Sequence, residues 1–217
     1  MKMHYQAAVF DLDGTLLDTL TDLYTATNAA LAAFGYPPRT REEVRAFVGN
    51  GVGLLIHRAL PAATPPEREA EVLAFFREYY AAHCREATAP YPGISALLRA
   101  LRDAGVRVAV VSNKFDAAVK DLCRAYFGDA VEVAVGESPT VRRKPAPDAV
   151  LSALRTLGVP LSGAVYIGDS DVDIATAAAA GLPCISVLWG FRDRDFLAAH
   201  GAATYAATAE ELRALLL

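Results

Sequence analysis

Four acidic residues stand where an α/β protein would carry catalytic groups. Asp11 and Asp13 directly follow the short apolar run 7–10, and Asp169 and Asp173 follow a similar run later in the chain. Carboxylates that converge repel one another unless a cation joins them, and a ligand set made only of oxygens favours Mg²⁺. These residues therefore predict a magnesium site.

A second set of polar residues has the chemistry to bind a phosphoryl group. Ser112, Asn113 and Lys114 follow the apolar run 106–111, and Lys144 lies in a loop before a predicted helix. A phosphoryl group in transfer needs positive charge and hydrogen-bond donors around its oxygens. One carboxylate can attack phosphorus to form an aspartyl phosphate, and another can serve first as acid and then as base. Both sets together predict phosphoryl transfer.

The elements that must position these residues alternate between strands and helices. Short apolar runs predict strands, and the segments between them have helical spacing; the strands are expected at 7–10, 106–111, 131–135, 164–167 and 184–187. Such alternation predicts a parallel sheet covered on both faces, with functional residues past the carboxyl ends of its strands.

The stretch 17–86 interrupts this alternation with a helical block. Apolar residues follow helical spacing from Leu16 to Phe34, Thr40 and Glu43 form a candidate capping box, and a proline-led helix begins near Pro66. We therefore expect a core made of residues 1–16 and 87–217, with an all-helical domain of residues 17–86 inserted between them.

Composition narrows the classes of function. Of the 217 residues 53% are hydrophobic, and the formal net charge is -4 with a pI of about 5.6, unlike the basic surface of a nucleic-acid binder. The three cysteines show no CxxC or disulfide pattern, which indicates a reducing compartment, and the run 7–10 is too short to span a membrane. We expect a cytoplasmic protein, monomeric or homodimeric, whose partner is a small phosphorylated metabolite and neither nucleic acid nor membrane.

The four chemical segments resemble the four motifs of the haloacid dehalogenase-like superfamily, in the right order and over essentially the whole chain. The matching segments are Asp11-Leu12-Asp13-Gly14-Thr15-Leu16, Val111-Ser112-Asn113-Lys114, Lys144-Pro145 and Gly168-Asp169-Ser170-Asp171-Val172-Asp173. The resemblance implies a Rossmann-like parallel sheet core with an inserted all-helical cap domain, and a Mg²⁺-dependent phosphatase that works through a phosphoaspartate.

The resemblance also implies a role for each residue. Asp11 would be the nucleophile and a metal ligand, and Asp13 the acid and base, with its backbone carbonyl on Mg²⁺. The phosphoryl oxygens would be bound by Ser112 and Lys144. Asp169 would be a further metal ligand and Asp173 a supporting acid. We expect four residues to contact the substrate: Thr15, Asn50, Asn113 and Lys114.

A narrower resemblance concerns the substrate. Phe47-Val48-Gly49-Asn50-Gly51-Val52, Arg58-Ala59-Leu60, Ser112-Asn113-Lys114 and Trp189-Gly190-Phe191 are similar to phosphoglycolate phosphatases. This similarity implies hydrolysis of 2-phosphoglycolate, with the Gly49-Asn50-Gly51 turn closing over the substrate.

Several alternatives stay open. The Gly49-Asn50-Gly51 segment is also typical of a plain turn between two helices, and Asp171 is expected to cap the helix that follows it. A phosphosugar mutase of the same fold usually carries extra basic residues in its cap for a second phosphate, whereas only Arg58 is near the Gly-Asn-Gly loop here, which favours hydrolysis. A dehalogenase is disfavoured because that branch generally lacks the second acid, which is Asp13 here. A catalytically silent binding module is permitted by the fold but disfavoured by the intact set of acids and Lys144.

Overall fold

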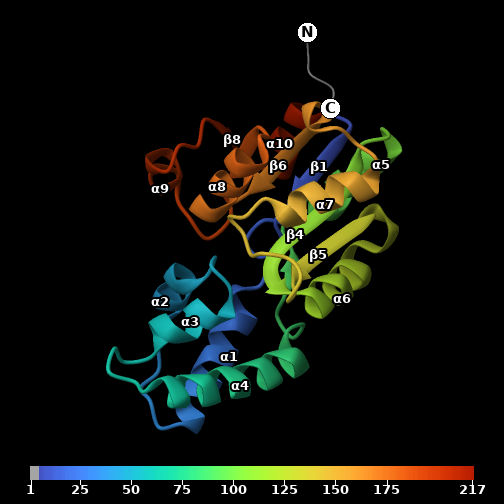
Figure 1. Ribbon diagram of the computed structural model, residues 1–217. Helices are drawn as coiled ribbons and strands as arrows, with labels where there is room; N and C mark the ends of the chain where they lie inside the picture. The colour runs from blue at the N-terminus through green and yellow to red at the C-terminus, as the bar shows by residue number, and fades with distance from the viewer. Residues whose placement is uncertain (1–4) are drawn as a thin grey trace. The chain divides into compact units, whose positions relative to one another are not determined.

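The central strand of the protein is the apolar run at the start of the chain. In the computed structural model, which describes residues 5–217, Ala7–Phe10 forms strand β1, and all four residues are fully buried. It lies in a six-stranded sheet (Figure 1) whose order is β5 (Val133–Glu137), β4 (Arg107–Phe115), β1, β6 (Ala164–Gly168), β7 (Cys184–Val187) and β8 (Thr204–Ala206). All neighbouring strands in it are parallel, which confirms the predicted α/β class.

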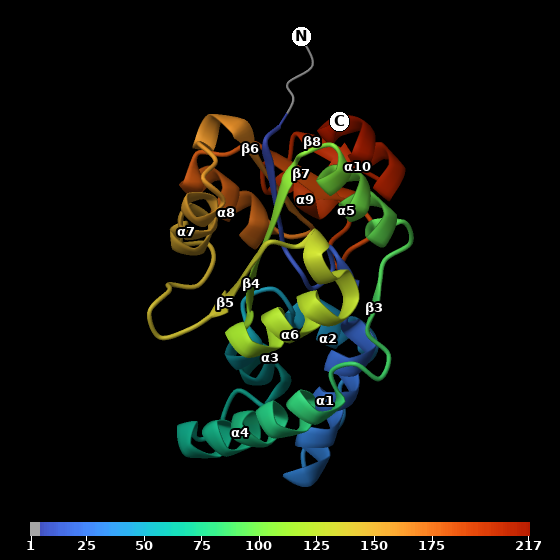
Figure 2. The same ribbon diagram turned by 90° about the vertical axis from the view of Figure 1, so that its right-hand side faces the viewer.

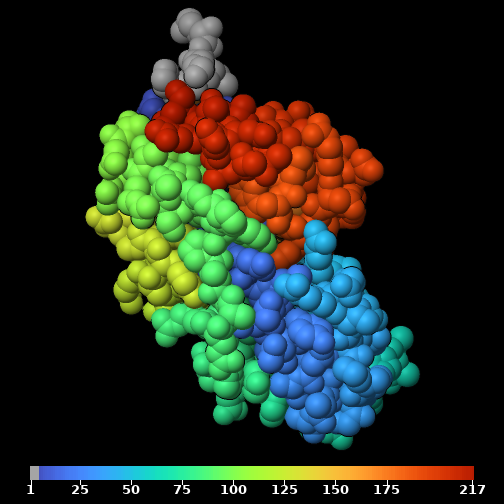
Figure 3. Space-filling view, turned by 180° about the vertical axis from the view of Figure 1, so that it is seen from behind, coloured from blue at the N-terminus to red at the C-terminus, as the bar shows by residue number. Residues whose placement is uncertain are grey.

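Helices cover both faces of the sheet because the side chains of each strand alternate between them. Ala8 and Phe10 of β1 belong to the core under α5 (Ile94–Asp103), α6 (Asp116–Phe127) and α10 (Ala209–Leu216). Ala7 and Val9 belong to the core under α7 (Asp148–Leu157) and α8 (Asp171–Ala180). Figure 2 shows these two sets of helices on opposite sides of the sheet, and Figure 3 shows α5 and α10 side by side on one face.

The strand order reverses direction at β1, and this reversal locates the site. From β1 the chain goes to β4 and β5 on one side of the sheet, and then returns to β6, β7 and β8 on the other. In open α/β sheets a crevice forms at such a switch point, outside the carboxyl ends of the strands. Residues that follow β1, β4 and β6 therefore meet at one edge.

A compact helical unit, Asp18–Ala89, interrupts this α/β unit, which consists of the chain up to Leu17 together with Pro90–Leu217. Its helices are α1 (Leu20–Ala33), α2 (Arg41–Phe47), α3 (Val52–Ala59) and α4 (Pro66–His83). The expected boundaries at residues 16/17 and 86/87 fall one and three residues earlier. The Thr40–Glu43 capping box at α2 and the proline start of α4 are confirmed.

Some local predictions were wrong. The helix expected to start at Leu16 starts later, because Leu16 N and Leu17 N both donate to Leu12 O in a tight loop. Leu17–Asp18 then forms the short strand β2, which pairs with β3 (Ala89–Pro90). Strand β4 runs four residues beyond the predicted end, because a register shift after Val111 keeps the polar residues in the sheet. The short elements α3, α9 (Arg194–Ala199) and β8 carried no distinct pattern, so β7 is not the last strand.

Candidate active site

Asp11 is the first residue after β1 and lies at the carboxyl edge of the sheet. Its backbone N donates to Ile167 O of β6 at 2.9 Å, which continues the strand pairing up to this residue. Its Oδ1 accepts a hydrogen bond from Leu12 N at 2.7 Å. The carboxylate is therefore held by the backbone at the switch point.

The loop after Asp11 is shaped to approach Asp169. Gly14 has a φ of +83°, and a Cβ atom there would clash with the Asp169 carboxylate. The next residue, Thr15, is fully buried and its Oγ1 donates to Asp169 Oδ1 at 3.0 Å. The glycine thus lets two segments 154 residues apart meet.

Asp169, directly after β6, is also held by the segment after β7. The backbone N of Phe191 donates to Asp169 Oδ2 at 2.7 Å, and a Cβ atom on Gly190 would clash with Asp169. Trp189 Nε1 donates to Thr15 O at 3.0 Å. Trp189, Gly190 and Phe191 therefore buttress the acids.

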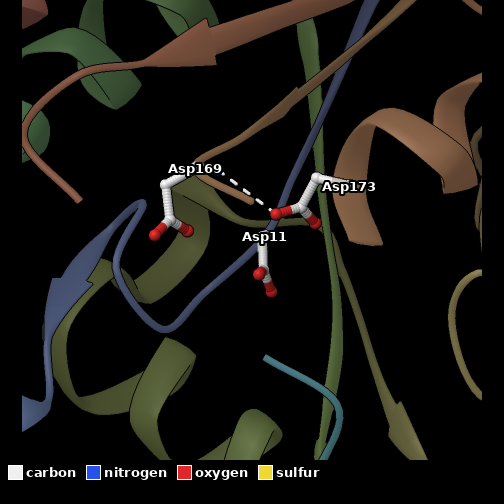
Figure 4. Close-up of side chains that lie close together, drawn as sticks. All are labelled: Asp11, Asp169 and Asp173. Carbon is white, nitrogen blue, oxygen red and sulfur yellow. Dashed lines mark hydrogen bonds between the residues drawn. The ribbon is translucent and has the colours of Figure 1, made fainter. Parts of the chain in front are cut away.

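Asp11, Asp169 and Asp173 converge on one small volume (Figure 4). One carboxylate oxygen from each lies within 4.8 Å of the others. Burial first, and then the neighbouring Asp173, raises the pKa of Asp11 well above its ordinary value and that of Asp169 to about 7. Crowded buried carboxylates of this kind are destabilised as anions and gain from a nearby cation.

Lys144 brings positive charge into this cluster. Its Nζ lies 2.9 Å from Asp11 Oδ1 and 2.8 Å from Asp173 Oδ1, and it donates to the Tyr166 hydroxyl at 3.1 Å. Burial alone lowers the pKa of Lys144, but the carboxylates of Asp11 and Asp173 raise it well above its ordinary value. The side chain is therefore an ammonium in a water-poor site, where it acts strongly on neighbouring negative charge.

Asp173 organises this cluster through both carboxylate oxygens. Oδ1 accepts from Lys144 and, at 3.0 Å, from the Tyr166 hydroxyl. Oδ2 accepts from the backbone N of Asp169, and from the backbone N and hydroxyl of Ser170. With five donors on it, Asp173 is suited to orient Lys144 and Asp169, in line with the supporting role expected for it.

The residues after β4 are buried and make contacts within the site. Asn113 Nδ2 donates to Lys144 O at 3.2 Å, and Asn113 Oδ1 accepts from Lys144 N at 2.8 Å. Ser112 Oγ accepts from Lys114 N at 3.2 Å, and Lys114 Nζ donates to Asp13 Oδ1 at 2.7 Å. The structure thus brings these expected substrate-contacting residues to the site, but their described side-chain contacts are with other site residues.

The donor set fits a hard divalent cation. All the candidate ligand atoms are oxygens, as Mg²⁺ requires. When every group is ionised, the carboxylates of Asp11, Asp13, Asp169 and Asp173 exceed the ammonium groups of Lys114 and Lys144 by two charges, which one Mg²⁺ balances. The three-carboxylate cluster contains Asp173 in place of Asp13, whose expected contribution to the metal is its backbone carbonyl. Because Asp173 has five protein donors, Asp11 and Asp169 are the better candidate side-chain ligands.

One expectation about this edge was wrong. Asp171 does not cap α8: the cap is Ser170, whose Oγ accepts from Asp173 N, while Asp173 Oδ2 accepts from Ser170 N. Ser170 precedes three helix-compatible residues and completes a capping box with an acid at the third position. This signal was present in the sequence.

Asn50 lies in the helical unit, in the turn between α2 and α3. Gly49 and Gly51 have φ values of 126° and 84°, which glycine adopts without strain. Arg58 spans the turn: Nη1 donates to Phe47 O at 2.9 Å and Nη2 to Asn50 Oδ1 at 3.0 Å. The Asn50 amide is therefore oriented, with its oxygen toward Arg58.

Two contributors to the site were missed from sequence. Tyr166 lies inside an apolar strand, where a tyrosine resembles ordinary core, yet its hydroxyl contacts Lys144 and Asp173. The backbone N of Phe191 donates to Asp169 across 22 residues, and no local pattern indicates such a contact.

No helix among residues 5–217 has the length and apolar character needed to cross a membrane.

Comparison with known proteins agrees with this geometry. The profile of the family described as haloacid dehalogenase-like hydrolase matches residues 8–187. A phosphoglycolate phosphatase of Neisseria meningitidis is 34% identical over 199 residues, covering 89% of this chain and 85% of the relative. One from Cereibacter sphaeroides is 40% identical over 189 residues, covering 85% of each chain.

Solved structures show the same architecture. A crystal structure from Lactobacillus delbrueckii subsp. bulgaricus superposes with a TM-score of 0.95 at 40% identity and covers 99% of both chains. The structure of CbbY from Rhodobacter sphaeroides in complex with phosphate has a TM-score of 0.77 at 32% identity and covers 96% of both. The protein therefore belongs to the haloacid dehalogenase-like hydrolases, and the family match includes Asp11, Ser112, Lys144 and Asp169.

Proposed function

We propose that this protein is a Mg²⁺-dependent phosphoric monoester hydrolase that cleaves 2-phosphoglycolate through a phosphoaspartate on Asp11. The observation that carries the chemistry is the position of Asp11: its carboxylate lies at the switch point of the sheet, 2.9 Å from the Lys144 ammonium and in one cluster with Asp169. The substrate is inferred from the relatives that bear the name phosphoglycolate phosphatase.

In the first step an Asp11 carboxylate oxygen attacks phosphorus. The bond from phosphorus to the ester oxygen breaks, and its electron pair leaves with that oxygen. Asp13, two residues further along the loop, gives its proton to the departing oxygen. This oxygen therefore leaves as the neutral hydroxyl group of glycolate. Lys144 and the hydroxyl of Ser112 stabilise the negative charge on the phosphoryl oxygens.

In the second step Asp13 acts as a base. It takes a proton from water while the water oxygen attacks phosphorus, and the bond from phosphorus to Asp11 breaks with its electron pair returning to the carboxylate. Inorganic phosphate is released, and both acids return to their starting states. Asp173, Tyr166 and Asn113 keep Lys144 in place during both steps through the contacts described above.

The metal site in this proposal consists of Asp11, Asp169 and the backbone carbonyl of Asp13. When bound, Mg²⁺ would neutralise charge on the phosphoryl group and relieve repulsion between the acids. Thr15 and the backbone N of Phe191 orient Asp169 for that role.

Selectivity is assigned to the turn that holds Asn50. Arg58 engages the Asn50 amide oxygen, which leaves the amide N–H groups as donors for an acceptor such as a carboxylate. 2-Phosphoglycolate carries a carboxylate on the carbon next to the phosphate ester, so a donor group suits it.

A cytoplasmic location and a monomeric or homodimeric state complete the proposal. No disulfide occurs in the described chain, which agrees with a reducing compartment. Sedimentation of the purified protein would measure the number of subunits.

The function is tested by phosphate release from a panel of phosphorylated metabolites, with and without Mg²⁺. We expect the highest kcat/KM for 2-phosphoglycolate among small monoesters. A panel in which hexose phosphates are isomerised without net phosphate release would instead identify a mutase, and an inert panel would identify a binding module.

A further inference from the structure

We propose that Lys114 is a positioning residue that fixes the Asp13 side chain and reserves its Oδ2 for the proton passed to the leaving oxygen. This inference rests on the proposed function, because it assigns a partner to the acid of that reaction. Lys114 Nζ lies 2.7 Å from Asp13 Oδ1, and the two side chains are 2% and 15% exposed. The pair is thus shielded from water, unlike most ion pairs of the protein.

Asp13 needs such a partner because its loop does not fix its carboxylate. It precedes Gly14, whose φ is positive, and its backbone pairs with Leu17 through an isolated bridge outside the named strands. Among residues 5–217, the Asp13 carboxylate forms its hydrogen bond and ion pair with Lys114. Without this contact the side chain would be able to rotate about χ1 and χ2.

Lys114, in contrast, is anchored. It belongs to the irregular end of β4, its backbone N donates to Ser112 Oγ, and its neighbour Asn113 is bonded to the Lys144 backbone. A Cβ atom on Gly136 of β5 would lie 2.6 Å from Lys114 O, so the two strands approach closely here. A lysine that is normally flexible is therefore presented in one orientation.

The contact also distinguishes the two oxygens of Asp13. A lysine ammonium has donors and no acceptor, so Oδ1 is held as an acceptor. The proton that moves to the ester oxygen must then be carried on Oδ2. As the bond from phosphorus to the ester oxygen breaks, that proton neutralises the electron pair on the oxygen, and Asp13 is left as a carboxylate paired with Lys114.

The test is the dependence of the rate on the leaving group in Lys114→Met. An alkyl phosphate such as 2-phosphoglycolate needs its leaving oxygen protonated, whereas an activated aryl phosphate does not. We expect kcat/KM for 2-phosphoglycolate to fall at least about tenfold further than for the aryl phosphate, since general acid catalysis contributes on the order of 10²–10⁴.

Lys120→Met is the matched control. Lys120 makes a similar ion pair with Asp116, at 2.6 Å, but on the surface of α6, where its side chain is 54% exposed. The same substitution there should leave the ratio of the two kcat/KM values at its wild-type value. Lys114→Arg, which keeps a charged donor, should restore part of the ratio and covers the case in which Lys114→Met does not fold.

The series separates this inference from the proposed function. If Asp13→Asn shows no leaving-group dependence, the acid role of Asp13 itself fails. If Asp13→Asn shows it but Lys114→Met lowers both substrates equally and raises KM, Lys114 binds substrate and the positioning role is overturned. In an Asp13→Asn background, we expect Lys114→Met to leave the ratio of kcat/KM for the alkyl and the aryl phosphate unchanged.

Discussion

The catalytic edge of the α/β unit and the Gly49-Asn50-Gly51 turn of the helical unit are built in opposite ways. At the edge, contacts join segments far apart in sequence: Thr15 binds Asp169 across 154 residues, and Asn113 binds Lys144 across 31. In the turn, a local hydrogen bond orients the Asn50 amide: it comes from Arg58, eight residues away.

This difference indicates a division of labour. The catalytic edge is buried, and hydrogen bonds join its segments. Its geometry is therefore preorganised for a reaction common to many phosphate monoesters. The turn is half-buried and rich in glycine, and it lies outside the two hydrophobic cores of the α/β unit, so it can change without disturbing them. Substitutions at the edge should therefore affect all substrates, and substitutions in the turn should affect only some.

The largest effect is expected for Asp11→Asn. The amide keeps the shape of the side chain but removes the nucleophilic charge, so turnover should fall on the order of 10⁴-fold or more, the scale seen when an enzyme loses its nucleophile. Phosphate release and circular dichroism would be measured together. Activity near the wild-type value in a folded variant would contradict the assignment of Asp11.

Removal of the metal should abolish the activity toward every substrate. Chelator is expected to abolish activity, with Mg²⁺ restoring it better than Ca²⁺, because Ca²⁺ accepts more ligands and bidentate carboxylates. Asp169→Ala should raise the Mg²⁺ concentration needed for half-maximal rate. Full activity in excess chelator would show that the acids serve another purpose.

Asn113→Ala tests the hydrogen bonds that join the segment after β4 to the loop of Lys144. The variant loses both hydrogen bonds to the Lys144 backbone, at about 1 kcal/mol each, which corresponds to roughly thirtyfold in kcat/KM if Lys144 is displaced. The loss should be similar for alkyl and aryl phosphates, since Lys144 acts on the phosphoryl group that both share. A loss confined to 2-phosphoglycolate would instead assign Asn113 to substrate recognition.

The smallest effect is expected for Asn50→Ala, and it should be selective. One lost hydrogen bond to a charged group corresponds to about tenfold in kcat/KM for 2-phosphoglycolate. An aryl phosphate that does not use the turn should be nearly unaffected, and His57→Ala, beside Arg58 on α3, is the matched control. If the ratio of the two substrates stays unchanged, the turn is only a connection between α2 and α3.

The sequence predicted the parts of the site that follow buried apolar runs. Asp11 and Asp169 could be located because a short apolar segment precedes each, and parallel strands bring their carboxyl ends to one edge. The same reasoning found Ser112, Asn113 and Lys114, although β4 continues through them. The α/β class followed from the alternation of the elements.

Contacts that depend on tertiary structure could not be predicted. Tyr166 has the pattern of a core residue, and only the positions of Lys144 and Asp173 give its hydroxyl a role. The contact between Lys114 and Asp13 spans 101 residues, and no local pattern indicates it. Strand β8 has three residues at the sheet edge, too few for a periodic signal.

A phosphoaspartate on Asp11 can be trapped chemically. Asp13→Asn should slow hydrolysis of the intermediate, so an acid quench after mixing this variant with Mg²⁺ and an aryl phosphate should capture it. Borohydride reduces an acyl phosphate to the alcohol, and peptide mass spectrometry then reads the modified position. We expect homoserine at position 11, and only when substrate and Mg²⁺ are both present. A burst of aryl alcohol with no modification at Asp11, or with modification at another residue, would contradict it.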